Sequence, residues 1–244
     1  AVGDSGGLWA LTGRATTVRK SVRVAAGDVI GRIECQPLWL PVQSRHQSSR
    51  WAAGGGAVIP TLETPRLWLR PLTVDDAPAV QQYFNNVHII GRLSKRVPWP
   101  YPDDGALVFL RDEVVPAMER GEVLAWGIVP KDGPGEVIGM IEHRLGDVDH
   151  GNRGFWLGEP FWGRGYMTEA VIRTQDHLLV ERGVERMVLL NSVDNIASRR
   201  VKEKTGAVRI GTALLEHHHG SNVCEKWELT RAQWLAWKDG RRAL

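Results

Sequence analysis

Beyond its first 65 residues, the chain switches repeatedly between the two-residue hydrophobic period of strands and the longer period of helices. Residues 66–72 alternate as a strand, and Thr73 and Asp76 have the spacing of a capping box that opens a helix to about residue 84. Another helix is predicted over 103–120, because its apolar residues recur every three or four positions. Two helices therefore separate the first strand from the later ones.

The rest of the pattern is richer in strands, which are predicted over residues 123–129, 137–145, 153–157, 186–190, 208–214 and 223–229. One helix between them runs from a glycine-rich turn to residue 182, and the next is capped by Asn195 and ended by Gly206. A last segment with Trp234 and Trp237 is predicted as a short helix on the surface. The order β-α-α-β-β-β-α-β-α-β-β is that of a mixed α/β fold.

The first 60 residues differ from the rest in pattern and charge. They show neither period, and they carry seven Lys and Arg against three Asp and Glu, while the remaining residues carry 24 against 25. The net charge of +3 therefore comes from this segment, and we expect no specific nucleic-acid partner. We interpret residues 1–60 as a disordered or adventitious leader and residues 61–244 as one domain.

Cysteine usage and hydropathy suggest where the protein works. Cys35 and Cys224 are far apart and belong to no paired motif, which is typical of a reducing compartment. No run of 18 apolar residues occurs, and the N-terminus lacks the regions of a signal peptide. The expectation is a cytoplasmic protein with no membrane partner, either a monomer or a homodimer.

The most informative segment lies between the strand at 153–157 and the helix that follows it. Gly163 and Gly165 allow the backbone to turn tightly, and the free N–H groups of the helix start favour an anion such as a diphosphate. No Gly-Lys-Ser/Thr follows, which excludes a P-loop, and the third glycine of a dinucleotide fingerprint is missing. A plain strand-to-helix turn without a ligand is the alternative.

Taken with its neighbours, this segment resembles a known family. The stretch from Gly154 to Ala170, then Asn195-Ile196-Ala197-Ser198 and Lys204-Thr205-Gly206, is similar to the GNAT superfamily of acyl-CoA-dependent N-acetyltransferases, and closer to its RimJ/RimL-type branch. The likeness extends over about residues 61–229. It implies a GNAT-type mixed, mostly antiparallel central sheet with splayed middle strands, flanked by helices.

The resemblance also implies where acetyl-CoA, the acyl donor, would bind. In the family it threads between the splayed strands, here 153–157 and 186–190, so that the strand backbone bonds the pantetheine and the glycine loop holds the diphosphate. The cofactor-binding residues carried over are Phe155, Trp156, Leu157, Trp162, Gly163, Arg164, Gly165, Tyr166, Met167 and Asn195. Arg164 either pairs with a CoA phosphate or stays solvated. Met167 departs from the small residue usual there, and its bulk is expected to crowd the helix start.

Two catalytic residues are expected, one acid and one base. In the RimJ/RimL-type Asn-x-x-Ser pattern the serine protonates the departing thiolate, which points to Ser198 here; the alternative is that Ser198 only occupies the third position of a capped helix. Glu142 is the candidate base, expected on the exposed side of its strand with His143 on the core side. His143 and a chain of waters remain competitors for that role.

The acceptor is expected to be a primary amine, either the N-terminal amine of a protein or a small molecule. The basic and aromatic segment 86–104 is expected to wall its pocket, or else to be an ordinary connector. His217, His218 and His219 lack further ligands at metal spacing, so no metal is expected. The rival interpretation is a catalytically silent acyl-CoA-binding or regulatory module.

Overall fold

The computed structural model describes residues 58–146 and 151–242. Its first sheet is antiparallel, with strands in sequence order: β1 (Leu62–Glu63), β2 (Leu67–Pro71), β3 (Val123–Pro130), β4 (Gly139–Arg144) and β5 (Arg153–Leu157). β1 is the one strand here that the hydrophobic pattern did not predict. The hydrophobic pattern was sufficient to predict the other strands, because the residues of each strand alternate between buried and exposed or are buried over its whole length.

The second sheet is also antiparallel and has the order β6-β8-β7. Its strands are β6 (Arg186–Ser192), β7 (Val208–Leu214) and β8 (Val223–Thr230). A bulge between Arg209 and Gly211 interrupts the pairing of β7 with β8. The predicted mixed, mostly antiparallel α/β fold is confirmed.

The helices agree with the pattern except in two places. They are α1 (Ala77–Phe84), α2 (Val87–Ile90), α3 (Gly105–Phe109), α4 (Val115–Glu119), α5 (Tyr166–Gln175), α6 (Ile196–Lys204) and α7 (Arg231–Arg242). A π-helical turn at Leu110–Val114 joins α3 to α4, and another at Asp176–Glu181 extends α5. Short 3-10 turns lie at Val74–Asp76 and Glu159–Phe161. The short helix α2 was not predicted, and the 103–120 helix contains an irregular turn.

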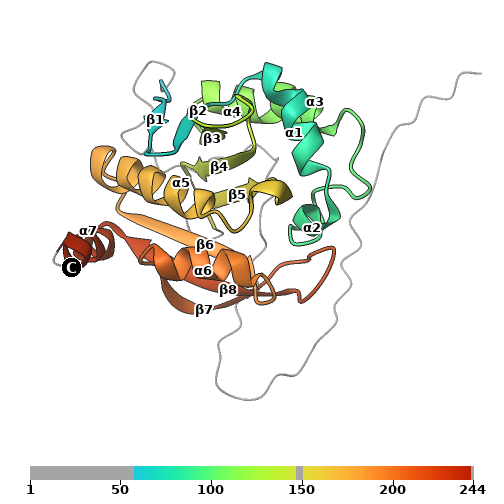
Figure 1. The fold of residues 1–244 in the computed structure, drawn as a ribbon. Helices are drawn as coiled ribbons and strands as arrows, with labels where there is room; N and C mark the ends of the chain where they lie inside the picture. The colour runs from blue at the N-terminus through green and yellow to red at the C-terminus, as the bar shows by residue number, and fades with distance from the viewer. Residues whose placement is uncertain (1–57, 147–150, 243–244) are drawn as a thin grey trace, which may run out of the picture.

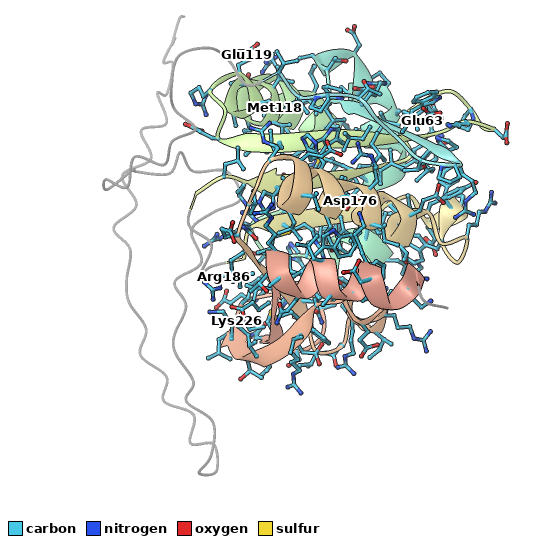
Figure 2. The ribbon with its side chains drawn as sticks, turned by 90° about the vertical axis from the view of Figure 1, so that its left-hand side faces the viewer. Glu63, Met118, Glu119, Asp176, Arg186 and Lys226 are labelled. Carbon is cyan, nitrogen blue, oxygen red and sulfur yellow. The ribbon has the colours of Figure 1, made fainter. Side chains whose placement is uncertain are left out.

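The elements form layers that Figure 1 shows from one side. Helices α1, α3 and α4 cover one face of the first sheet, α5 lies against the other face, and the second sheet with α6 lies beyond α5. Figure 2 gives the same order from another direction, with Met118 at the end of α4, Asp176 after α5, and Lys226 on β8. No helix among the described residues is long and apolar enough to cross a membrane.

Hydrogen bonds at Asn152 join the two sheets in the described structure. The Asn152 N–H donates to Val188 O at 2.9 Å, and the Val188 N–H donates to Asn152 Oδ1 at 3.2 Å. Among the described strands no ladder joins β5 to β6. One edge of β5 is therefore left without a strand partner, and the sheets diverge from the Asn152 contact, as the resemblance implied.

Both chain ends of the domain are more deeply packed than the sequence suggested. The predicted short surface helix is α7, in which most residues are exposed or half-buried. Its Trp234, however, is 0 % exposed and donates from Nε1 to Asp176 Oδ1 at 3.0 Å. Ile59 belongs to the core, and Pro60 O accepts from Trp126 Nε1 at 2.9 Å. Ile59 and Pro60 thus pack with the domain, and most of the proposed leader lies outside the described residues.

Candidate active site

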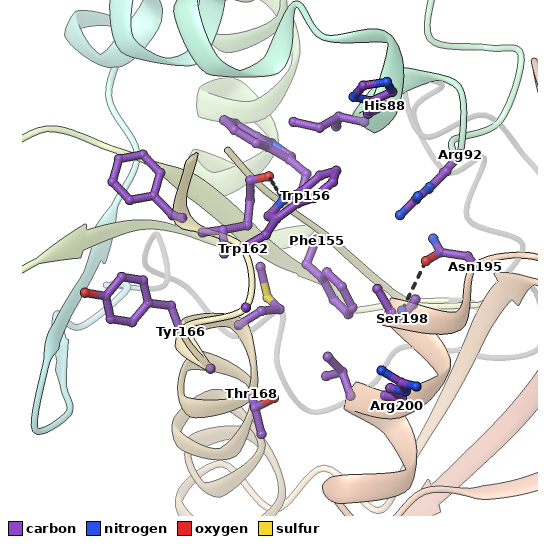
Figure 3. Close-up of a pocket in the computed structure, with 18 of the residues that line it drawn as sticks. His88, Arg92, Phe155, Trp156, Trp162, Tyr166, Thr168, Asn195, Ser198 and Arg200 are labelled. Atoms are coloured by element: carbon purple, nitrogen blue, oxygen red, sulfur yellow. Dashed lines mark hydrogen bonds between the residues drawn. The ribbon is translucent and has the colours of Figure 1, made fainter. Parts of the chain in front are cut away.

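A cavity of about 310 Å³ opens where the two sheets diverge (Figure 3). It is lined by β5, the turn before α5, the first turn of α5, the length of α6, and helix α2 with the residues after it. The lining includes most of the predicted site: Phe155, Trp156, Leu157, Trp162, Gly163, Gly165, Tyr166, Met167, Asn195 and Ser198. Arg164 and Glu142 are not part of it. Tertiary folding thus brings together residues from segments more than 40 positions apart.

The glycine turn has the backbone conformation that the sequence suggested. Gly163 has φ 76° and Gly165 has φ 79°, a left-handed region that L-residues rarely adopt. Gly165 is the N-cap of α5, and no hydrogen bond from the N–H groups of residues 163–168 to an acceptor in the described parts of the chain is found. These N–H groups and the helix dipole together favour an anion at this wall of the cavity.

A clamp between the domain's first segment and α5 holds this turn in place. Glu169 Oε1 accepts from Thr64 Oγ1 at 2.7 Å and from the Arg66 N–H at 2.9 Å. Arg66 also donates from Nη1 to Arg164 O at 2.9 Å. These hydrogen bonds hold the pKa of the Glu169 carboxyl below its usual range, although burial opposes them. The opening Thr64-Pro65-Arg66 therefore has a structural function, which is to fix the helix start.

The two unusual loop residues, Trp162 and Met167, are both accommodated. The Trp162 indole donates from Nε1 to Leu157 O at 2.6 Å, which ties the loop to the end of β5. Met167 is 8 % exposed and belongs to the hydrophobic core. The core takes up its bulk, so the structure gives no support to the expected crowding of the helix start.

Ser198 lies at the cavity wall beside Phe155 (Figure 3). Its backbone N–H donates to Asn195 Oδ1 at 3.1 Å, which is the predicted helix cap. Its side chain has a partner that sequence analysis did not assign: Lys202 Nζ donates to Ser198 Oγ at 2.7 Å. The spacing of Ser198 and Lys202 could have predicted this contact, since residues four positions apart on a helix are neighbours.

Lys202 is 1 % exposed, an unusual burial for a lysine. Burial, followed by the nearby charge of Arg153, lowers its pKa well below the ordinary value. Arg153 is itself buried, which lowers its pKa to about 9, and it donates from Nη1 to Gln175 Oε1 at 2.7 Å. Two cationic side chains therefore occupy the region behind Ser198.

Glu142 does not lie where the sequence analysis expected it. It is 7 % exposed rather than solvated, because the helical layer covers the face of β4 that was taken to be open. Burial raises the pKa of its carboxyl, with a smaller opposing effect from Arg144. Burial also raises the pKa of the nearby Glu113 to about 7, with contributions from Asp112 and Glu142. These carboxyl groups lie apart from the cavity lining.

His143 is the other candidate base from the sequence. It is buried on the opposite face of β4, as expected, and it does not line the cavity. Burial is the main cause that lowers its pKa to about 3, and Arg153 adds to the effect. A base with so low a pKa is neutral at physiological pH but accepts a proton poorly.

The cavity contains a histidine that the sequence analysis overlooked. His88 on α2 lines it, and His88 Nδ1 lies 3.0 Å from Glu159 Oε1. Asn86 donates from Nδ2 to Glu159 Oε2 at 2.7 Å. The hydrogen bonds from Asn86 and then His88 lower the pKa of the Glu159 carboxyl. The carboxylate orients the imidazole and leaves Nε2 free of this contact.

The segment 86–104 lines the cavity through His88, Ile89, Arg92 and Leu93. The loop between β7 and β8 supports this segment from outside. The His219 N–H donates to Gly91 O at 3.0 Å, and His218 Nε2 lies 2.5 Å from Val97 O. In the described parts of the chain, no group of three His, Cys, Asp or Glu side chains could hold a metal ion. The histidine run thus braces the cavity wall.

The charged side chains that line the cavity are basic. Arg92, Arg200 and Lys204 line it, and no aspartate or glutamate is among its lining residues in the described structure. Cationic side chains and unpaired N–H groups favour a ligand that carries negative charge. Fold and site together give a mixed α/β protein with a basic cavity between two sheets and a serine in its wall.

Comparison with known proteins agrees with this description. The model of the acetyltransferase (GNAT) domain matches residues 66–208, and the chain therefore belongs to the GNAT acetyltransferase family. An uncharacterized N-acetyltransferase p20 from Bacillus licheniformis is 26 % identical over 129 residues, which are 52 % of this chain and 70 % of that protein.

Solved structures show the same fold. The ribosomal-protein-S5-alanine acetyltransferase from Vibrio fischeri has a TM-score of 0.61 and 20 % identity, and the match covers 71 % of this chain and 98 % of that one. RimJ from Mycobacterium smegmatis, in complex with CoA-disulfide, has a TM-score of 0.58 and 19 % identity over 70 % of this chain and 88 % of its own.

Proposed function

We propose that this protein transfers an acetyl group from acetyl-CoA to a primary amine, by direct attack of the amine in a ternary complex. The observation that carries the proposal is the cavity itself, in which an anion-binding helix start, a free strand edge and a serine hydroxyl line one space. Those three features match the diphosphate, the amide-containing arm and the thioester of acetyl-CoA. Family membership gives independent support to acetyl transfer.

Each part of the donor has a group in the cavity that suits it. The N–H groups at residues 163–168 would hold the diphosphate, and Arg92, Arg200 and Lys204 add positive charge around it. The free edge of β5 offers backbone groups to the pantetheine and to the thioester oxygen. A donor at that oxygen commonly contributes about 10²–10³ in rate, because negative charge develops there as the amine attacks.

Ser198 is the proposed acid, which protonates the departing thiolate. It lines the cavity at the start of α6, where the helix dipole also stabilises a nearby negative charge. His88 is the proposed proton acceptor for the attacking amine, in place of Glu142. We assign this role to His88 because it lines the cavity and is oriented by Glu159, whereas Glu142 is buried away from it.

The acceptor proposed is the N-terminal amine of a protein. The absence of carboxylates among the cavity-lining residues of the described structure disfavours a polycationic small molecule, which would need an anionic pocket. The similar Vibrio fischeri protein is named as an acetyltransferase for an alanine of ribosomal protein S5, which supports a protein as the acceptor.

A thiol-release assay tests the proposal. Acetyl-CoA is supplied with three sets of amines, namely peptides with free N-termini, polyamines and aminoglycosides, beside a calorimetric titration of acetyl-CoA alone. We expect turnover with peptides and no turnover with the same peptides when their N-termini are blocked. Tight acetyl-CoA binding with no turnover on any amine would instead identify a silent acyl-CoA-binding module.

The role of His88 has its own test. We expect His88→Gln to lower kcat about 10²-fold, because glutamine keeps a polar side chain but accepts no proton. Lys95→Gln in the same segment is the control, since Lys95 does not line the cavity. Near-normal kcat in the His88 variant would show that water or another group takes the proton.

A further inference from the structure

The hydrogen bond between Lys202 and Ser198 determines where the serine proton points. A lysine ammonium only donates, so in this contact Ser198 Oγ is the acceptor and its own O–H proton is directed elsewhere. No hydrogen bond donated by Ser198 Oγ to an acceptor within the described residues is found. Because Ser198 lines the cavity, the free O–H is available to a ligand there.

A serine hydroxyl acting alone is a poor acid for a thiolate. Loss of its proton would leave an alkoxide, which is a far stronger base than the thiolate it had protonated. The transfer is favourable only if Oγ receives another proton as it gives up its own. The only group seen within hydrogen-bond distance of Oγ among the described residues is Lys202 Nζ, at 2.7 Å.

We propose that Lys202 is a positioning residue for Ser198, whose Nζ holds the hydroxyl with its proton toward the cavity and replaces that proton as the thiol forms. The inference rests on the proposed acetyl transfer. In the step, the Ser198 O–H proton passes to the sulfur while one Nζ proton passes to Oγ. One S–H bond forms and one N–H bond breaks. Lys202 is left as a neutral amine and regains its proton from water.

The surroundings of Lys202 make both of its protonation states accessible. Arg153 faces it from β5, and burial and this charge lower its pKa, which makes the ammonium a better acid than an exposed lysine. Glu225 and Cys224 face it from β8 and act in the opposite direction. Glu225 is already engaged, since Arg199 donates to its Oε2 at 2.9 Å and Asn191 at 3.0 Å. No carboxylate in the described part of the chain is therefore seen to pair with Lys202 Nζ and hold it in the charged form.

The variants Lys202→Met and Lys202→Arg separate proton transfer from packing and charge. Methionine fills similar apolar space without a proton, while arginine keeps the charge and the N–H donors but does not deprotonate. We expect both to lower kcat about 10-fold or more with the KM for acetyl-CoA nearly unchanged. The wild-type kcat should fall as pH rises through the lowered pKa of Lys202, and this limb should be absent in Lys202→Met. Lys131→Met is the control, since Lys131 does not line the cavity.

A measurement without substrate completes the test. In protein labelled with ¹³C at lysine Cε, we expect one signal to titrate well below the others, to vanish in Lys202→Met and to shift in Ser198→Ala. The inference would be overturned if both Lys202 variants kept the wild-type kcat and pH profile. It would also be overturned if that signal titrated together with those of the other lysines. A wild type that turns over no amine would contradict the proposed function itself, an outcome distinct from an active wild type with unaffected Lys202 variants.

Discussion

We expect Ser198→Ala to lower kcat about 10²-fold while the KM for acetyl-CoA changes little, because the hydroxyl is used only when the thiolate leaves. Steady-state thiol release with a peptide acceptor measures both constants. The helix cap should survive, since Asn195 bonds the backbone N–H of residue 198 and not its side chain. Near-normal kcat would mean that water or another group protonates the sulfur.

The same substitution should also cost stability, which the cap alone would not suggest. Ser198 Oγ accepts from the buried Lys202 Nζ, and its removal leaves that amine without this partner. Such a loss typically costs about 1–3 kcal/mol. The double variant Ser198→Ala with Lys202→Met removes both partners and should recover much of the melting temperature without recovering kcat. Recovery of kcat as well would show that Ser198 contributes to folding and not to the chemistry.

Gly165→Val should weaken acetyl-CoA binding by 10²-fold or more. A Cβ at residue 165 would meet only Arg66 Nη2 at 3.5 Å, so the site has room for a side chain. The backbone is the obstacle, because a β-branched residue disfavours φ 79° and would turn the loop's N–H groups away from the phosphates. Each hydrogen bond to a charged group contributes about 1.5–3 kcal/mol, and a loss of about 1.4 kcal/mol weakens affinity tenfold. Loss of two such bonds would therefore account for the expected effect.

Gly135→Val is the matched control for this loss. Gly135 has φ 75° in the turn between β3 and β4, and nothing lies within 4 Å of a Cβ built there. We therefore expect Gly135→Val to lower the melting temperature about as much as Gly165→Val does, while its affinity for acetyl-CoA, measured by calorimetry, stays unchanged. If Gly165→Val destabilises the fold as the control does but binds acetyl-CoA normally, the glycine turn is not the phosphate site.

The sequence by itself was sufficient for most of the secondary structure and for the conformation of the glycine turn. Strands such as β5 and β7 have the predicted bounds, because alternation and turn residues are local properties of the chain. The N-cap at Asn195 and the left-handed glycines before α5 were also predictable, since each depends on a few neighbouring residues. Residues near each other in sequence therefore identified one wall of the cavity.

Tertiary structure decided which groups are exposed and which meet. Alternation along β4 distinguishes its two faces but does not say that helices cover one and α5 the other, and so Glu142 proved to be buried. The burial of Trp234 was not predictable for the same reason, since it depends on packing near Asp176, which is far away in sequence. His88 and Glu159 come together only because the segment after α1 folds over the end of β5.

Lys202 shows the difference most clearly. Its distance from Ser198 along α6 was fixed by the sequence, because residues four apart share a helix face. The burial of Lys202 was not fixed by the sequence, since it depends on the packing of β5 and β8, which bring Arg153 and Glu225 near it. Local pattern thus determined the elements and the glycine turn, whereas burial and long-range contact, which shift the pKa values of the buried groups, came only with the packing of the two sheets.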